Sequence, residues 1–307
     1  MLAIALLGCG QGTRPPGPAN DSVENQAILA KLDHYIGCLQ DHSSSVFQIA
    51  DAYTTRVAGT PPTAETRVVL LASREPRECV EAIATARALS PSIPELDAAG
   101  EAFGAALGSV FALTTEGAGY YARGSKTYDP AKGAALHPRL VAAFDAFDRA
   151  QGALFDQVYR LNRTVHLDQL DRREKKSGRK LVIVSESMLI DAEALVRFAA
   201  APWDQLDKLD LQALVTEIGA LEEAIGEMTA YAIEHEDETL AFDQYRLLMD
   251  RAKEYVIAAR QLAERARANV AYSDAEKIMI RAGNEAGVIG TPGAMSKAYN
   301  RLVEIWF

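Results

Sequence analysis

Long hydrophobic runs and positive charge are both scarce in this sequence. No uninterrupted apolar run reaches about 18 residues, the length that a helix needs to cross a bilayer, so no membrane-spanning helix is expected. The chain has 32 basic and 42 acidic side chains among its 307 residues, for a formal net charge of −10. Because nucleic-acid binding requires a basic face that neutralises phosphates, this balance argues against a nucleic-acid partner.

Aromatic residues are also few, at 7% of the chain, whereas 49% of the residues are apolar and alanine is abundant. Strands favour aromatic and β-branched residues, and alanine is the best helix former, so the composition favours helices. The apolar share is sufficient for a substantial core.

Recognisable catalytic motifs are absent as well. The sequence has no Gly-x-Ser-x-Gly nucleophile motif and no glycine-rich phosphate-binding loop. We therefore assign no catalytic residue and do not expect an enzyme. The alternative of an envelope enzyme with an unrecognised acidic site stays open, because paired carboxylates can lie far apart along a chain.

The five histidines do not show the spacing of metal ligands. His34 and His42 are eight residues apart, too far for two ligands on adjacent turns of one helix, and His137, His166 and His235 stand alone. We expect neither a metal site nor a cofactor.

The first 22 residues differ from the rest of the chain. Leu6-Leu7-Gly8-Cys9 is similar to a bacterial lipobox, in which a signal peptide is cut before a cysteine that carries diacylglycerol. We expect residues 1–8 to be the end of a signal-peptide hydrophobic region, Cys9 to be lipidated, and residues 9–22 to form a flexible Gly/Pro-rich tether.

This interpretation places the protein in the cell envelope, facing the periplasm. Gly10 follows the cysteine, where Asp would favour inner-membrane retention, so the outer membrane is slightly favoured. No Lys or Arg precedes Cys9, which leads us to expect that the true start lies upstream. The alternative is an ordinary cytosolic N-terminus with a chance cysteine.

Two further cysteines remain if Cys9 carries lipid. In an oxidising compartment, Cys38 and Cys79 are expected to form a disulfide. The bridge would close a loop of about 40 residues and contribute on the order of 4 kcal/mol. The alternative is a pair of buried free thiols, which is the expected state in a cytosolic protein.

Apolar residues recur at helical spacing through the rest of the chain, with breaks at Pro- and Gly-rich segments. The expected helices are 23–57, 63–74, 76–89, 94–121, about 138–200 with a bend near Gly178, about 214–234, 242–270, 273–282 and 292–306. Short links between long helices predict an all-α fold, an elongated up-and-down bundle of antiparallel helices forming one domain over residues 23–307.

Several segments, taken in order, resemble the YiiG-like family of bacterial lipoproteins. The segments are Leu32-Asp33-His34-Tyr35-Ile36-Gly37-Cys38-Leu39, Tyr120-Tyr121, Lys126-Thr127-Tyr128-Asp129, Gly133 and Leu136-His137. The resemblance spans about residues 25–235 and implies an exported, lipid-anchored helical domain of unknown function. It implies no catalytic residues.

A connector between two expected helices carries the candidate ligand-binding residues Tyr120, Tyr121, Lys126, Tyr128 and His137. Connectors on rigid scaffolds often carry binding groups, and tyrosine offers a flat surface together with a hydroxyl. The alternative is that the paired tyrosines only end the apolar stripe of a core helix and that Pro138 starts the next helix.

A basic segment reverses the charge of the chain locally. Its residues Arg172, Arg173, Lys175, Lys176, Arg179 and Lys180 are candidates for contact with an anionic surface. A solvated helix face is the alternative.

Together these patterns predict a lipid-anchored envelope protein that acts as a helical binding or scaffolding module. Its expected partners are the membrane, through the anchor at Cys9, and an envelope protein or polymer. A cytosolic helical interaction protein is the alternative that a reduced Cys38 and Cys79 would favour.

Overall fold

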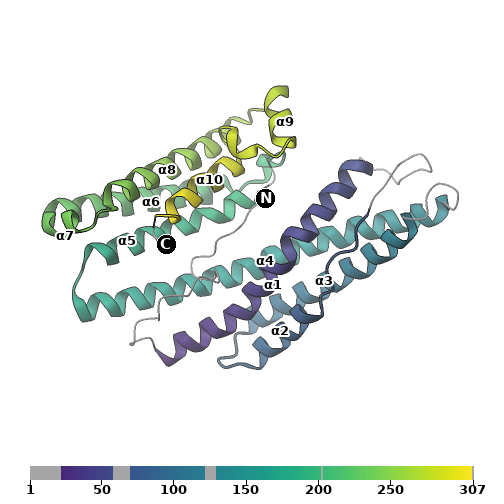
Figure 1. Cartoon of the computed structure of the whole chain (residues 1–307), viewed down its shortest axis with the longest axis horizontal. Coiled ribbons are helices and arrows are strands. Elements are labelled where there is room, and N and C mark those ends of the chain that lie inside the picture. The colour runs from purple at the N-terminus through teal and green to yellow at the C-terminus, as the bar shows by residue number, and fades with distance from the viewer. Residues whose placement is uncertain (1–21, 58–69, 122–128, 202, 306–307) are drawn as a thin grey trace. The chain divides into compact units, whose positions relative to one another are not determined.

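The computed structural model describes residues 22–57, 70–121, 129–201 and 203–305 (Figure 1). These ranges contain ten α-helices and three short 3-10 turns, with no strand, so the prediction of an all-α fold is confirmed. The helices are α1 (Val23–Val57), α2 (Arg77–Ala88), α3 (Pro94–Tyr121), α4 (Pro130–Ser177), α5 (Leu181–Val196), α6 (Leu211–Glu234), α7 (Glu236–Ala241), α8 (Tyr245–Ala268), α9 (Asp274–Arg281) and α10 (Pro292–Val303).

The described helices pack as two compact units. We call residues 16–165 the N-terminal unit and residues 166–307 the C-terminal unit. Residues of α4 belong to both units, and the single domain expected over residues 23–307 stays a prediction. The expected boundary between the signal peptide and the tether, at residues 8 and 9, lies outside the described residues and stays a prediction.

In the N-terminal unit, α1 buries the apolar stripe that the sequence predicts. Leu32, Leu39, Val46 and Tyr53 are all buried on this helix. On α3, Gly100 lets the helix approach α1 closely, because a Cβ placed there would lie 2.2 Å from the Tyr35 ring. Among the described helices, only α3 is long and apolar enough to cross a membrane by length and composition. One face of α3 packs within the unit against α1 and α2.

The prediction of a helix over residues 63–74 is wrong for residues 70–74, the part of this range that the structure describes. Residues 70–76 are not helical, and α2 begins only after Pro76. The backbone N–H of Ser73 instead donates to the hydroxyl of Thr114 on α3 at 3.1 Å. This tertiary hydrogen bond and the buried side chain of Leu70 thus hold the segment in a non-helical conformation. The local periodicity of apolar residues had favoured a helix there.

Helix α4 begins at Pro130, eight residues before the expected start at Pro138. It ends at Ser177, where Gly178 adopts a φ of +77° that favours glycine. The expected bend is therefore a complete break, after which α5 begins at Leu181. A side chain from far along the chain caps α5, because the Leu181 N–H donates to Glu238 Oε2 at 3.0 Å.

The C-terminal unit is built around α5, which is buried on most of its circumference. Helices α6, α8 and α10 contribute one continuous apolar core with α5, including the fully buried Leu195, Leu221, Leu248 and Leu302. The predicted ends of α6, α9 and α10 agree with the structure to within a few residues.

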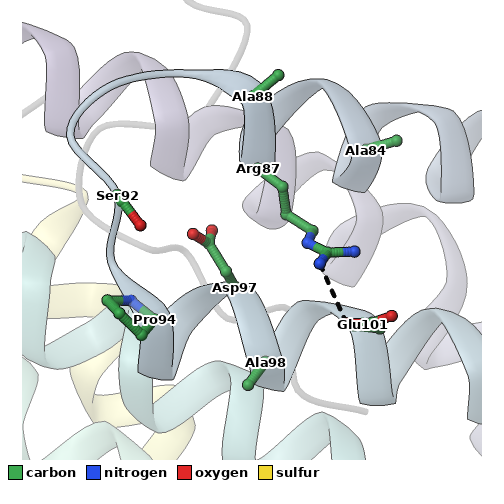
Figure 2. A pocket seen from close by; sticks show the side chains of 8 residues that line it. All are labelled: Ala84, Arg87, Ala88, Ser92, Pro94, Asp97, Ala98 and Glu101. Atoms are coloured by element: carbon green, nitrogen blue, oxygen red, sulfur yellow. Dashed lines mark ion pairs between the residues drawn. The ribbon is translucent and has the colours of Figure 1, made fainter.

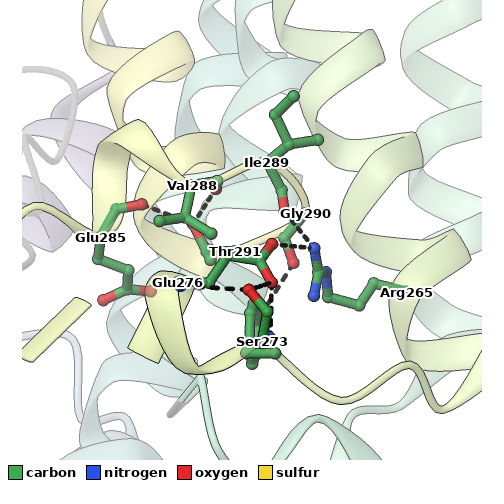
Figure 3. Close-up of polar contacts among 9 residues, drawn as sticks. Arg265, Ser273, Glu276, Glu285, Val288, Ile289, Gly290 and Thr291 are labelled. Carbon is green, nitrogen blue, oxygen red and sulfur yellow. Dashed lines mark hydrogen bonds and ion pairs between the residues drawn. The ribbon is translucent and has the colours of Figure 1, made fainter. Parts of the chain in front are cut away.

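Arg265 joins the last turn of α8 to the segments on either side of α9 (Figure 3). Its guanidinium lies 2.8 Å from Glu276, donates to the carbonyl of Ile289 at 3.1 Å, and stacks over Tyr272 at 4.2 Å from the ring centroid. Gly290 fits closely beside Arg265 at a φ of +73°. These contacts fix α9 at the end of α8.

Candidate functional site

Cys38 on α1 and Cys79 on α2 form a disulfide, as the sequence predicted. Their Cα atoms are 5.0 Å apart, and both residues are buried, at 2% and 4% exposure. The bridge ties the middle of α1 to the first turn of α2. Cys9, the predicted lipidation site, lies outside the described residues.

Three of the five candidate ligand-binding residues lie together at one end of the N-terminal unit. The hydroxyl of Tyr53 on α1 is 2.9 Å from Nδ1 of His137 on α4 and 3.5 Å from the hydroxyl of Tyr121. The rings of Tyr120 and Tyr121 are in edge contact at 4.9 Å. Lys126 and Tyr128 lie outside the described residues.

The polar groups of this cluster already have partners within the chain. Tyr120 donates its hydroxyl to the carbonyl of Asp129 at 2.6 Å, and burial lowers the pKa of His137, which favours its neutral form. Tyr53 is only 1% exposed. The arrangement joins α1, α3 and α4, so its structural role is clear, and ligand contact by these residues stays a prediction.

The predicted basic segment is largely ion-paired. Arg172 pairs with Asp168, Arg173 with Glu186, Lys175 with Asp171, and Arg179 with both Glu174 and Glu227. Lys176 and Lys180 are exposed, and no ion pair is assigned to either. Carboxylates thus offset most of the positive charge, and contact with an anionic surface stays a prediction.

Metal ligands do not gather in the part of the chain that the structure describes. There, no group of three or more His, Cys, Asp or Glu side chains is placed to hold a metal ion.

A groove in the N-terminal unit lies where α2 turns into α3. Its volume is about 570 Å³, and Figure 2 shows its walls. The lining residues are Ala84, Arg87, Ala88, Ser92, Pro94, Asp97, Ala98 and Glu101. Arg87 from α2 and Glu101 from α3 form an ion pair at 3.3 Å, and the Asp97 carboxylate faces the same space.

A buried lysine supports this groove from behind. Lys31 on α1 is fully buried, and its ammonium lies 2.9 Å from Asp97. It also donates to the carbonyls of Leu89 and Pro91 at 3.3 and 3.2 Å. All three ammonium protons therefore have an acceptor, which is what a buried charge requires. The contacts hold the turn between α2 and α3 against α1.

Tyr35 completes this buried network by donating its hydroxyl to Asp97 at 2.7 Å. Burial by itself raises the pKa of Asp97, but hydrogen bonds from Lys31 and Tyr35 outweigh it, so the pKa lies below its ordinary value. Burial and the neighbouring Asp97 carboxylate raise the pKa of Tyr35. Asp97 is thus held ionised and Tyr35 protonated.

Sequence reasoning missed Lys31, Tyr35 and Asp97 because none belongs to a recognised motif. One signal was present: Lys31 lies one helical turn before Tyr35, next to Leu32 on the apolar face of the predicted helix. A lysine in that position needs an acidic partner from another element. The partner's identity depends on tertiary packing, which periodicity does not supply.

The groove offers charged groups of both signs together with small apolar side chains. A guanidinium and two carboxylates at its wall suit a small polar ligand that carries both charges.

Comparison with known proteins identifies a matching family and a similar curated protein. A family model described as "Protein of unknown function (DUF3829)" matches residues 26–305. The chain is 24% identical over 303 residues to "Uncharacterized protein YiiG" of Escherichia coli (strain K12), covering 95% of this chain and 82% of that protein. No solved structure is significantly similar to the chain.

Proposed function

The chain belongs to the family described as Protein of unknown function (DUF3829), and we propose that it is a lipid-anchored protein of the cell envelope that acts as a helical binding or scaffolding module. The observation that carries this proposal is the disulfide between Cys38 and Cys79. Disulfides persist in oxidising compartments outside the cytosol. The bridge also leaves Cys9, in its lipobox-like setting, as the one cysteine of the three outside it.

The anchor would hold the helical units close to a membrane. A diacylated cysteine binds strongly because each buried CH₂ contributes about 0.8 kcal/mol. Residues 10–22 span at most about 45 Å when extended, which sets the reach of the tether. Confinement within this distance raises the local concentration of the module at the membrane without any further contact.

Metabolic labelling with an alkyne fatty acid tests the anchor. The protein is expressed from its own gene, and the wild type is compared with Cys9→Ala. We expect labelling and membrane fractionation of the wild type and loss of both in Cys9→Ala. The double variant Cys38→Ala/Cys79→Ala is the control, which keeps its label. Equal labelling of wild type and Cys9→Ala would contradict the proposal.

We propose that the groove between α2 and α3 serves the binding role. The side chain of Arg87 is 47% exposed and that of Glu101 is 64% exposed, so both remain accessible to a ligand. Charged groups of both signs on opposite walls match a zwitterion such as an amino acid or an amino sugar.

Thermal unfolding in the presence of amino acids and amino sugars tests this role. A ligand that binds the groove raises the melting temperature of the wild type and not that of Arg87→Ala/Glu101→Ala. The control is Arg139→Ala/Glu116→Ala, which removes another exposed ion pair, outside the groove, and keeps the response. If no compound stabilises the wild type, or all three proteins respond equally, binding at the groove is refuted.

A further inference from the structure

Helix α9 carries apolar side chains on the face that it turns to solvent. Ala275, Ile278, Met279 and Ala282 follow a spacing of three, four and seven residues, which places them on one face of the helix and its last turn. Ile278 is 68% exposed and Met279 is 39% exposed. We call these four residues the α9 stripe.

The opposite face of α9 is the one that packs. Ile280 is buried with Tyr272 and Val288 in a small apolar cluster, and Glu276 is held by Arg265. Folding therefore uses the inner face and leaves the α9 stripe exposed. Two neighbouring segments add exposed apolar side chains, with Val270 at 54% and Ile289 at 65%.

The helix is also fixed in place and projects from its unit. A capping box closes its first turn, in which Ser273 and Glu276 bond each other's backbone N–H groups. Figure 1 shows α9 at the end of the C-terminal unit, beyond the last turn of α8.

The local charge points to an anionic partner. Residues 265–282 contain four basic and two acidic side chains, in a chain whose net charge is −10. Arg265 pairs with Glu276 and Lys277 pairs with Asp274, so among the described residues the exposed Arg267 and Arg281 carry the positive charge that is not offset by an ion pair. Basic side chains beside exposed apolar ones are typical of helices that lie at the interface of anionic bilayers.

Another pair of exposed apolar residues in the C-terminal unit is surrounded by acidic side chains instead of basic ones. Ile233 and Leu240 are 76% and 71% exposed, but the segment around them carries Glu234, Glu236, Asp237 and Glu238. Anionic lipids repel such a surface, so this pair serves as a matched control.

We propose that the α9 stripe docks onto the surface of an anionic lipid bilayer, where it provides a second membrane contact beside the lipid at Cys9. This inference rests on the proposed function, because the tether limits the distance between the units and the membrane. A weak interfacial helix becomes effective under that confinement, since the second contact is then made within one molecule.

A fluorophore placed in the stripe tests the docking directly. Cys9→Ser leaves the bridged Cys38 and Cys79 as the only other cysteines, so the added Met279→Cys gives one free thiol in the full chain. The thiol is labelled with the environment-sensitive dye NBD and mixed with phosphatidylglycerol vesicles. Leu240→Cys in the same background is labelled in the same way as the control position.

We expect the emission at position 279 to shift to the blue and to be quenched by a lipid-phase quencher, while position 240 stays in water. Vesicles of phosphatidylcholine alone should give a weaker response. Residues 1–8 are present in both proteins and therefore do not account for a difference between the two positions.

Substitutions that remove the apolar side chains give a second measure. In the Cys9→Ser background, Ile278→Asp should lower partitioning onto phosphatidylglycerol vesicles by roughly tenfold or more, whereas Ile233→Asp should leave it unchanged. Both side chains are exposed, so circular dichroism should show unchanged helicity in both variants.

Three results would overturn the inference. The first is a dye at position 279 that stays in water while the protein sediments with vesicles. The second is an equal response at positions 240 and 279. The third is a blue shift without vesicles that accompanies a dimer, which would make a second copy the occupant of the stripe. Absence of fatty-acid labelling at Cys9 in the wild type would contradict the proposed anchor only. The vesicle measurements would remain interpretable, because they are made in the Cys9→Ser background.

Discussion

The ammonium of Lys31 and the carboxylate of Asp97 lie 2.9 Å apart, with Lys31 fully buried and Asp97 only 14% exposed. The pair joins α1 to the start of α3 beside the groove. Because an unpaired charge is costly to bury, each partner is needed to accommodate the other.

Lys31→Met should destabilise the protein by about 3 kcal/mol, since Asp97 would lose its buried partner. Urea unfolding of the wild type and the variant measures this difference. Lys176→Met, at an exposed position on α4, should change the free energy of unfolding by less than about 0.5 kcal/mol. The double variant Lys31→Met/Asp97→Asn should recover part of the lost free energy of unfolding. An equal loss in Lys31→Met and in the double variant would argue against the interaction of Lys31 with Asp97.

Gly100→Ala and Gly108→Ala should have opposite effects although both lie on α3. A Cβ at Gly100 would lie 2.2 Å from the Tyr35 ring, whereas nothing lies within 4 Å of one at Gly108. We expect Gly100→Ala to cost about 1–3 kcal/mol through overpacking. Gly108→Ala should stabilise the helix by about 0.5–1 kcal/mol. Thermal unfolding distinguishes the two, and equal effects would show that α1 and α3 do not approach closely at Gly100.

Removing the disulfide should lower stability without changing the fold. Cys38 and Cys79 are 41 residues apart, for which the chain-entropy model gives about 4 kcal/mol. Cys38→Ala/Cys79→Ala should therefore unfold at lower urea concentration with unchanged helicity, and dithiothreitol should have the same effect on the wild type. Two titratable thiols at positions 38 and 79 in protein purified without reductant would contradict the bridge.

Buried His42 should make the protein less stable in mild acid. Burial, aided by the charge of Arg74, lowers the pKa of His42, although Asp41 and Glu78 act in the opposite direction. In the unfolded chain the pKa of His42 is near 6.5, so below that pH the unfolded chain binds a proton that the folded chain binds only at lower pH. This contribution is absent above pH 6.5 and grows as the pH falls from 6.5 towards the lower pKa of the folded state.

Urea unfolding between pH 7.5 and 5 measures this effect. His42→Leu should flatten the dependence of the free energy of unfolding on pH. If the free energy of unfolding changed with pH by the same amount in the wild type and in His42→Leu, His42 would not be the cause of the acid destabilisation.

Most helices could be predicted from the sequence because their apolar stripes are long and their ends carry Pro or Gly. Residues 94–121 were predicted with the observed ends, and a bend was predicted near Gly178, where the structure has a complete break. Residues 70–74 were predicted wrongly because the Thr114 hydroxyl, remote in sequence, competes for a backbone N–H there. Apolar stripes show which face of a helix is buried, and they do not show against which other helix that face packs.

The candidate site was predicted only in part. The sequence brought Tyr120, Tyr121 and His137 together, since they flank one connector, but it missed their partner Tyr53, 84 residues before His137. The Lys31 network and the groove depend on α1, α2 and α3 meeting in space. The pairing of Cys38 with Cys79 was predictable because parity, together with the expectation of export, left one bridge.

The mass of the N-terminal peptide of the mature protein tests the central claim most directly. Protein purified from membranes of its own host would be digested and analysed by mass spectrometry. The account predicts a peptide that begins at Cys9 and carries the added mass of diacylglycerol, with residues 1–8 absent. A peptide that retains residues 1–8, with an unmodified thiol at Cys9, would contradict it.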